Sequence, residues 1–197
     1  MTQRLCAAQA RSPVKSTSHT DKAAMIPLLM VSLATFNIQG LGDEIKQSNI
    51  DRDCVRYGMD IICLQETKVT ESYEHTFPTS GNKMFILDQF SGRHRGIGFV
   101  ISKRMLPCVT EIKQISTNVG YVDFELQSRS GLPTKCRVVN AYSPHSRTTD
   151  VNPELRDDFF DELKCAITNV PSNHELFICG DFNARIGKLD LRKCDEI

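Results

Sequence analysis

The sequence lacks the features of several functional classes. It holds 24 Lys and Arg residues against 24 Asp and Glu residues, so no net charge attracts nucleic acid or an acidic membrane to the whole surface. Its cysteines form no Cys-x-x-Cys pair, which argues against a zinc site. It has no apolar stretch long enough to cross a membrane, no internal repeat and no low-complexity tract. Contact with nucleic acid would therefore depend on local basic groups.

The eight cysteines indicate a reducing compartment. Cys63 and Cys179 lie inside apolar, strand-like runs, where a thiol behaves as a small core side chain. We interpret the cysteines as reduced and predict an intracellular protein, nuclear or cytoplasmic and not secreted. The apolar run Met25–Leu33 is short, and neither a cationic start nor a small-residue cleavage site marks it as a secretory signal.

The sequence predicts one domain between two irregular ends. A chain of 197 residues suits one domain with a substantial core. Residues 1–30 are expected to form a disordered leader, because Ser, Thr, Gln and basic residues dominate up to Lys22. The domain is predicted over residues 31–190, and residues 191–197 are predicted to be a tail.

The first part of the domain reads as strand, helix, strand. A strand is predicted to begin near Val31. Asp43 is suited to cap a helix over residues 44–57, and Gly58 is suited to end it. The nearly continuous apolar run over residues 60–66 is typical of a central strand that is buried on both faces.

The rest of the domain is rich in short strands. A helix is predicted with Asn152 as its cap and Pro153 at its first position, followed by an apolar strand at Leu176–Cys179. Between the two helices, short strands are predicted at residues 84–88, 96–102, 109–115, 121–127 and 136–142. Single helices and hairpin-like strands in this order favour mixed sheets packed between helices, and hence the α/β (α+β) class.

Polar side chains stand at the ends of several predicted strands. Asn37 ends the first strand, Glu66 the second and Tyr142 a later one. Asp181 and Asn183 follow the last strand two residues apart, so in extended chain they point to the same side. Ligands of mixed α/β sheets bind beyond strand ends, so these groups can serve one site. Oxygen ligands without His or Cys suit a hard cation such as Mg²⁺ together with substrate phosphate.

Such a set of side chains suits phosphodiester hydrolysis. A metal held by Glu66 would neutralise charge on a phosphate oxygen, and Asp181 would orient or deprotonate the attacking water. Asn37, Asn183 and Tyr142 would donate hydrogen bonds to phosphate oxygens. Taken one at a time, the same residues also fit ordinary roles. Glu66 fits a solvated strand end, Asn37 and Asp181 fit turns, and Tyr142 fits a half-buried loop.

Five stretches in fixed order carry a resemblance to a known family. They are Leu33–Leu41, Ile61–Thr67, Arg95–Ser102, Val139–Pro144 and Gly180–Gly187. Together they resemble the endonuclease/exonuclease/phosphatase (DNase I-like) superfamily over Val31 to Lys188. The chain looks most like the apurinic-type endonuclease domains of non-LTR retrotransposons and the craniofacial development protein 2-like proteins. The resemblance implies a four-layer sandwich of two mixed β-sheets flanked by helices.

The resemblance also implies magnesium-dependent cleavage of phosphoesters, with Mn²⁺ as an alternative cofactor and DNA as the substrate. Glu66 matches the family's metal-ligand glutamate, and Asn37 matches the asparagine beside the metal and phosphate. Tyr142 matches the phosphate-contacting tyrosine. Asp181 and Asn183 match the water-orienting aspartate and its partner amide. The resemblance implies no membrane and no specific protein partner.

Three further residues are weaker candidates for contact with phosphate or DNA. They are Arg95, His145 and Arg185. Arg95 also suits a solvated turn, and His145 an ordinary loop. His145 stands near Tyr142, at a position where family members often carry an asparagine.

The sequence departs from the family after Asn183. Family members continue into a strand with an aspartate and then a Ser-Asp-His motif, whose histidine contacts the scissile phosphate; residues 189–197 contain no histidine. We therefore expect the fold to lack its C-terminal strands and this chain alone to cleave DNA weakly or not at all. Two alternatives stay open. One is a non-catalytic retroelement-derived fragment or interaction module, and the other is a phosphatase of inositol phosphates or phospholipid head groups on the same fold.

Overall fold

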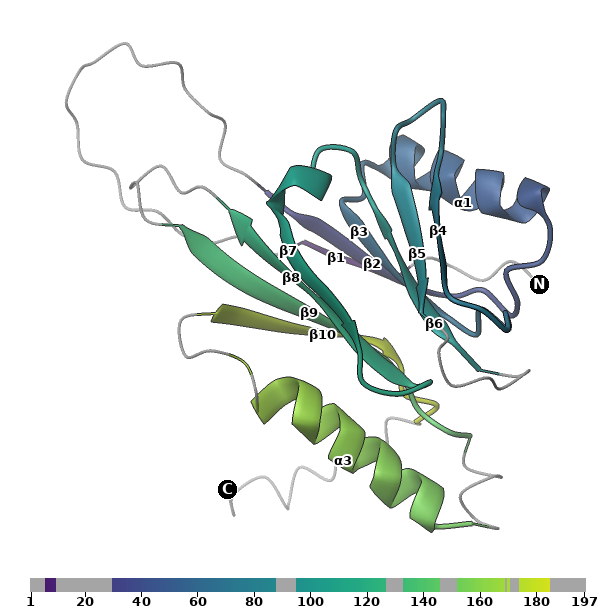
Figure 1. The fold of residues 1–197 in the computed structure, drawn as a ribbon, viewed down its shortest axis with the longest axis vertical. Coiled ribbons are helices and arrows are strands. Elements are labelled where there is room, and N and C mark those ends of the chain that lie inside the picture. The colour runs from purple at the N-terminus through teal and green to yellow at the C-terminus, as the bar shows by residue number, and fades with distance from the viewer. Residues whose placement is uncertain are drawn as a thin grey trace, which may run out of the picture.

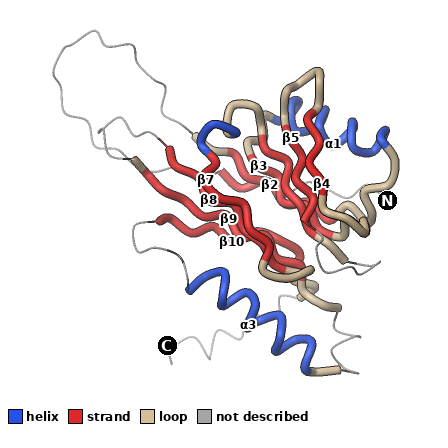
Figure 2. The backbone as a smooth tube through the Cα atoms, in the orientation of Figure 1, coloured by secondary structure: helices blue, strands red, loops and turns tan. Residues whose placement is uncertain are grey.

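Two β-sheets lie face to face between two helices in the computed structural model of the chain (Figure 1). The structure describes residues 6–9, 30–87, 95–126, 133–145, 152–168, 170 and 174–184. Helix α1 (Glu44–Tyr57) covers the outer face of the first sheet, and helix α3 (Glu154–Thr168) covers the outer face of the second. The order of layers is therefore helix, sheet, sheet, helix, and Figure 2 shows the strands between the two helices.

The first sheet has six strands in the order β1-β2-β3-β6-β5-β4. They are β1 (Cys6–Gln9), β2 (Ser32–Asn37), β3 (Ile61–Gln65), β4 (Tyr73–Thr76), β5 (Lys83–Leu87) and β6 (Ile97–Ile101). Strands β2 and β3 are parallel, and the other neighbouring pairs described in this sheet are antiparallel. Because β2 and β3 run the same way, both end at the same edge of the sheet.

The second sheet has four strands in the order β10-β9-β8-β7. They are β7 (Val109–Gln114), β8 (Val119–Leu126), β9 (Thr134–Tyr142) and β10 (His174–Asp181), and a 3₁₀ turn, η1 (Leu106–Cys108), leads into β7. Strands β9 and β10 are parallel, whereas β7, β8 and β9 pair antiparallel. Both sheets are mixed, which confirms the predicted class.

Helix α1 begins and ends where its capping residues predict. The Asp43 side chain accepts a hydrogen bond from the Lys46 backbone N–H at 2.9 Å, and Gly58 ends the helix with a left-handed φ of +61°. The helix buries Ile50 and Cys54 against the first sheet.

Helix α3 begins at Glu154, one residue after the Pro153 that the sequence predicts as its first position. Its apolar stripe buries Phe159, Leu163 and Ala166 against the second sheet. The two helices thus cover opposite outer faces of the sandwich.

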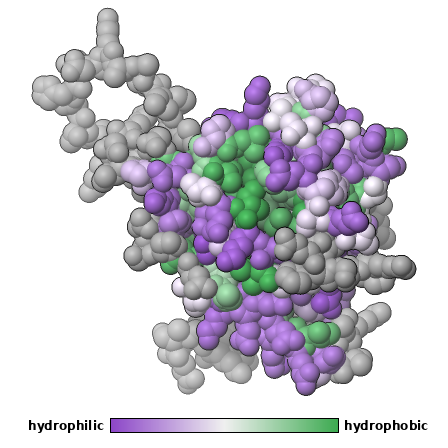
Figure 3. Space-filling view, in the orientation of Figure 1, coloured by the Kyte–Doolittle hydropathy of each residue, from purple (hydrophilic) through white to green (hydrophobic). Residues whose placement is uncertain are grey.

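Alternating side chains of the strands fill three apolar layers. The layer between α1 and the first sheet contains Ala34, Ile50, Cys54, Ile62, Leu64 and Val100. The layer between the sheets contains Leu33, Ile61, Cys63, Phe99, Val122 and Val138. The layer between the second sheet and α3 contains Val119, Tyr121, Val139, Phe159, Leu163 and Ala166. All five residues of β3 are buried, which confirms a central strand covered on both faces. In Figure 3 apolar residues gather along the middle of the visible face, where the two sheets approach each other.

Two strands of the first sheet were not predicted. Strand β1 lies inside the stretch expected to be a leader and pairs antiparallel with β2. The open edge of β2 offers backbone donors and acceptors, so a short segment can pair there without a distinctive sequence. Strand β4 has three exposed residues out of four, so it carries no apolar alternation that would reveal it.

Other predictions fall on residues that the structure leaves undescribed. These include most of the leader and the tail at residues 191–197. Among the described residues, no helix combines the length and apolar character that a membrane crossing requires.

Candidate active site

Four strand ends meet at one edge of the sandwich. In the first sheet Asn37, at the end of β2, pairs with Gln65, at the end of β3, so Glu66 follows next to Asn37. In the second sheet the parallel strands β9 and β10 pair Tyr142 with Asp181. The polar residues predicted at separate strand ends therefore lie together.

The side-chain amide of Asn37 joins the two sheets. Its Nδ2 donates to Glu66 Oε1 at 2.7 Å and to Asp181 Oδ2 at 2.8 Å. One amide thus holds two carboxylates that come from different sheets. The sequence predicts donation from Asn37 to a phosphate oxygen, whereas in the structure its amide hydrogens serve the carboxylates.

A second set of contacts fixes the loop after β10. Asp181 Oδ1 accepts from the Asn183 backbone N–H at 2.9 Å, which closes an Asx turn. Asn183 Nδ2 donates to the Ser143 carbonyl at 2.6 Å, and the Ser143 backbone N–H donates to the Asp181 carbonyl at 2.9 Å. Both carboxylate oxygens of Asp181 therefore have donors, and the loops after β9 and β10 are tied together.

Left-handed backbone is concentrated at this edge. Among the described residues, the non-glycine positions with positive φ are Gln39 at +52°, Glu66 at +55°, Lys68 at +54° and Asn183 at +46°. Such conformations cost on the order of 1–3 kcal/mol each and persist where surrounding contacts impose them. All four lie in the loops that follow β2, β3 and β10, next to Asn37, Glu66 and Asp181.

The backbone at position 180 explains why a glycine precedes Asp181. Its φ is +151°, and a Cβ at this position would stand 1.9 Å from the Ala141 carbonyl oxygen of the neighbouring strand. A side chain here would push β10 away from β9. The Gly-Asp sequence is thus a condition for placing the Asp181 carboxylate.

Glu66 is charged despite its burial. It is 8% exposed, and burial by itself raises the pKa of a carboxyl group. Hydrogen bonds from Asn37, Lys68 and Tyr142 act in the other direction, as does the charge of Lys68. Their combined effect lowers the pKa of the Glu66 carboxyl below its ordinary value of 4.5. The cation paired with this carboxylate in the structure is the Lys68 ammonium, 2.9 Å from Glu66 Oε2.

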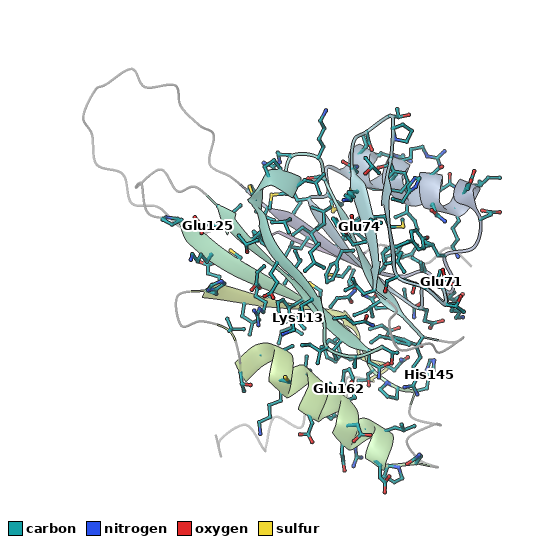
Figure 4. The ribbon with its side chains drawn as sticks, viewed as in Figure 1. Glu71, Glu74, Lys113, Glu125, His145 and Glu162 are labelled. Atoms are coloured by element: carbon teal, nitrogen blue, oxygen red, sulfur yellow. The ribbon has the colours of Figure 1, made fainter. Side chains whose placement is uncertain are left out.

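Tyr142 keeps its proton at neutral pH. Burial is the main cause that raises the pKa of its phenol, and the hydrogen bond to Glu66 and the negative charges of Glu66 and Asp181 add to it. The hydroxyl oxygen also lies 3.5 Å from His145 Nε2. His145 is exposed, beyond the end of β9 (Figure 4). Tyr142 is therefore a hydrogen-bond donor at the site.

The two candidate arginines have different outcomes. The Arg95 carbonyl accepts from the Lys68 backbone N–H at 2.8 Å, which brings Arg95 next to the loop of Glu66. Arg185 lies outside the described residues. Contact of either guanidinium with phosphate stays a prediction.

Comparison with known families decides the relationship of the chain. The sequence model of the Endonuclease/Exonuclease/phosphatase family matches residues 34–195. The chain belongs to this family. The resemblance expected from the five ordered stretches is confirmed at this level.

A curated relative of this family member is the DNA repair nuclease APEX1 of Danio rerio. The two are 24% identical over 185 residues, which are 91% of this chain and 56% of the relative. The chain therefore spans little more than half the length of that protein.

Solved structures confirm the DNase I-like fold. The catalytic domain of Xenopus laevis APE2 superposes with a TM-score of 0.58 at 15% identity, over 80% of this chain and 60% of that one. An AP endonuclease from Archaeoglobus fulgidus gives 0.57 at 18%, over 82% and 60%. The 3′ phosphatase NExo from Neisseria, bound to a product DNA hairpin, gives 0.57 at 18%, over 79% and 59%. At these identities the likeness concerns the fold.

Lys68 is a site residue of this endonuclease/exonuclease/phosphatase domain that sequence reasoning missed. Its Nζ lies 2.9 Å from Glu66 Oε2, and its side chain is 34% exposed. The sequence carried no clear signal for it, because Glu66 and Lys68 both have left-handed backbone and the two-residue alternation of extended chain does not apply there. The site thus carries one ammonium group beside its two carboxylates.

Proposed function

We propose that this chain is a domain that hydrolyses phosphodiester bonds of DNA with Mg²⁺, or with Mn²⁺ in its place. Within the family we assign it to the apurinic-type endonucleases of non-LTR retrotransposons, and an intracellular location goes with a DNA substrate. The observation that carries the proposal is the amide of Asn37, which holds the carboxylates of Glu66 and Asp181 together. A DNA repair nuclease among the relatives and a DNA-bound 3′ phosphatase among the similar folds support DNA as the substrate.

The donor set fits a hard divalent cation. Glu66 and Asp181 both reach the same amide nitrogen, so their oxygens face one small region. Among the described residues, no group of three or more His, Cys, Asp and Glu side chains is gathered to hold a metal by itself. Mg²⁺ is commonly bound by one or two carboxylates that share it with water and substrate phosphate. Glu66 would hold the ion, which supplies charge neutralisation at a phosphate oxygen.

The remaining chemistry falls to side chains already fixed in place. Asp181, held by Asn37 and by the Asn183 N–H, would orient the attacking water and accept its proton. Tyr142 has one hydroxyl hydrogen, which serves Glu66 in this structure, and would turn it to a phosphate oxygen as negative charge develops there. Lys68 would add positive charge on the same side.

We expect cleavage to be slow. Of the described histidines, His145 is the one at this edge, and its ring lies against Tyr142 and not against Asp181. Within the described part of the chain, proton transfer would then rest on Asp181 alone. A well-placed acid or base typically contributes about 10²- to 10⁴-fold in rate.

A nicking assay tests the proposed function. Supercoiled plasmid, with and without abasic sites, is incubated with the full chain and Mg²⁺, and a parallel sample contains EDTA. We expect magnesium-dependent nicking that falls by about 100-fold or more in Glu66→Ala and in Asp181→Ala. Glu71→Ala, which removes an exposed carboxylate from the following loop, is the matched control and should keep the rate.

The assay also separates the alternatives. An equal background from the wild-type chain and both site variants would contradict a nuclease and favour a non-catalytic module. Phosphate release from inositol phosphates, without nicking, would favour a phosphatase on the same fold. Nicking that survives EDTA would contradict the role given to Glu66.

A further inference from the structure

Two buried side-chain amides connect the sheets next to the site. Gln65 is the last residue of β3, and Asn140 lies two residues before the end of β9. Gln65 is 1% exposed and Asn140 0%. Gln65 Nε2 donates to Asn140 Oδ1 at 2.7 Å, which links the first sheet to the second. This Gln65–Asn140 pair therefore joins the strands that lead into Glu66 and Tyr142.

Every amide hydrogen of the pair has an acceptor. Asn140 Nδ2 donates to the carbonyls of Leu64 and Gly98, each at 2.9 Å. Besides its contact with Asn140, Gln65 Nε2 donates to the Cys63 carbonyl at 3.1 Å. Asn140 thus contacts both β3 and β6 of the opposite sheet.

The oxygen of Gln65 completes the network. It accepts from Thr35 Oγ1 of β2 at 3.1 Å, so one side of the pair also reaches the strand that ends in Asn37. A fully satisfied polar network in a low-dielectric interior favours one arrangement of its members. Three strands of the first sheet are therefore held in one position relative to β9.

Stability alone is a weak reason for these amides. Apolar side chains from both sheets, for example Cys63 and Val138, fill the space between the sheets beside the pair. A buried hydrogen bond contributes little net stability, because folding exchanges it for bonds to water. What the amides supply, and apolar residues do not, is a defined direction and distance between two sheets.

We infer that the Gln65–Asn140 pair is a positioning pair for the active site. Asn37 and Glu66 come from the first sheet and Tyr142 and Asp181 from the second, so their separation depends on how the sheets are placed. The pair sets that placement, and its role in catalysis rests on the proposed function. The pair itself touches neither substrate nor metal.

The test compares the Gln65–Asn140 pair with a buried amide, Asn82, at the opposite end of the first sheet. Asn140→Leu and Gln65→Met remove the link between the sheets with side chains of similar volume. Asn82→Ala is the control, because Asn82 is 5% exposed and its amide donates to Asp51 at 2.8 Å. By strand register Asn82 precedes the row of Lys83 and Ile101, away from the site.

The first readout does not require activity. Hydrogen exchange of the Asn37 side-chain amide, followed by NMR on the full chain, reports whether its bridge to Glu66 and Asp181 holds. We expect this amide to exchange about tenfold faster in Asn140→Leu than in the wild type. A tenfold change corresponds to the net free energy of about one hydrogen bond. We expect no such change in Asn82→Ala. The two variants are compared under conditions in which both have lost the same free energy of unfolding.

The second readout is DNA nicking. Misplacement of catalytic groups by about 1 Å can cost on the order of 100-fold in rate, so kcat should fall by about 10- to 100-fold in Asn140→Leu while KM for DNA stays near that of the wild type. The swapped double variant Gln65→Asn with Asn140→Gln keeps both amides and should recover part of both losses. If Asn140→Leu does not fold, Gln65→Met carries the same comparison.

The outcomes for the pair and for the nuclease are distinguishable. Faster exchange at Asn37 without nicking by the wild-type chain would support the positioning pair and contradict the nuclease. Equal exchange in Asn140→Leu, Gln65→Met and Asn82→Ala would overturn the positioning pair, whatever the nicking assay shows. A loss in kcat that only follows overall stability would also overturn it.

Discussion

Two carboxylates flank the central strand β3, Asp60 before its first residue and Glu66 after its last. Both are buried, at 3% and 8% exposure, so burial does not distinguish them. Asp60 accepts from Arg104 Nε at 3.1 Å and Nη2 at 2.5 Å. It also accepts from the Ser32 backbone N–H at 2.9 Å and from Ser102 Oγ at 3.2 Å. Both carboxylate oxygens of Asp60 thus accept hydrogen bonds from the Arg104 guanidinium and from residues beside its own sheet.

Glu66 is held in a different way. Its partners are an amide that also holds Asp181 and an ammonium on a partly exposed lysine side chain, Lys68. Its backbone is left-handed, as is that of Lys68. The comparison teaches that a carboxylate fixed by its own sheet serves the fold. A carboxylate that shares its partner with a second carboxylate from another sheet marks a site.

The largest difference is expected in stability. Asp60→Asn places an amide group against donors from Arg104 and Ser32, and should reduce the free energy of unfolding by about 2–3 kcal/mol. Glu66→Gln should reduce it by less than about 1 kcal/mol, because functional carboxylates contribute little to stability. Urea unfolding followed by circular dichroism measures both. Equal losses would break the distinction between the two ends of β3.

The sequence predicts local features of the fold better than it predicts contacts between the sheets. The cap at Asp43, the stop at Gly58 and the apolar run of β3 follow from local chemistry, and the structure confirms them. The meeting of Asn37 with Asp181 was expected only as a shared edge, because the residues are 144 positions apart. Their common amide depends on how two sheets stack.

Contacts across the sandwich were the least predictable. Gln65 and Asn140 each sit in an apolar run, where a single polar residue shows no partner in sequence. Their contact spans 75 positions and exists because β3 and β9 face each other. Asn183 was predicted as the partner amide of Asp181, but its anchoring to the Ser143 carbonyl arises from the parallel pairing of β9 and β10.

A smaller effect is expected from backbone strain. Gly58, at the end of α1, has φ +61° and open space around it, whereas Gln39, near the site, has φ +52° and carries an exposed side chain. Gly58→Ala should cost about 1 kcal/mol, because alanine resists the left-handed region. Gln39→Gly should increase the free energy of unfolding by about 0.5–1 kcal/mol, because glycine adopts the left-handed region without strain. The backbone N–H at this position keeps its bond to Asn37 Oδ1. Thermal unfolding of both variants tests this, and a loss in Gln39→Gly would show that Gln39 is not strained.

The smallest effect is expected from pH, because two opposing causes act on Glu66. Burial raises the pKa of its carboxyl, and the hydrogen bonds from Asn37, Lys68 and Tyr142 lower it further than burial raises it. A group whose pKa is lower in the folded state stabilises the fold above its unfolded pKa, near 4.5, and this contribution disappears as pH falls through the folded pKa. The wild-type chain should therefore lose stability relative to Glu66→Gln as pH falls below 4.5. Urea unfolding at a series of pH values measures the difference, with Glu71→Gln as a correction for removing one negative charge. A difference that grows in favour of the wild type on acidification would mean that burial dominates at Glu66.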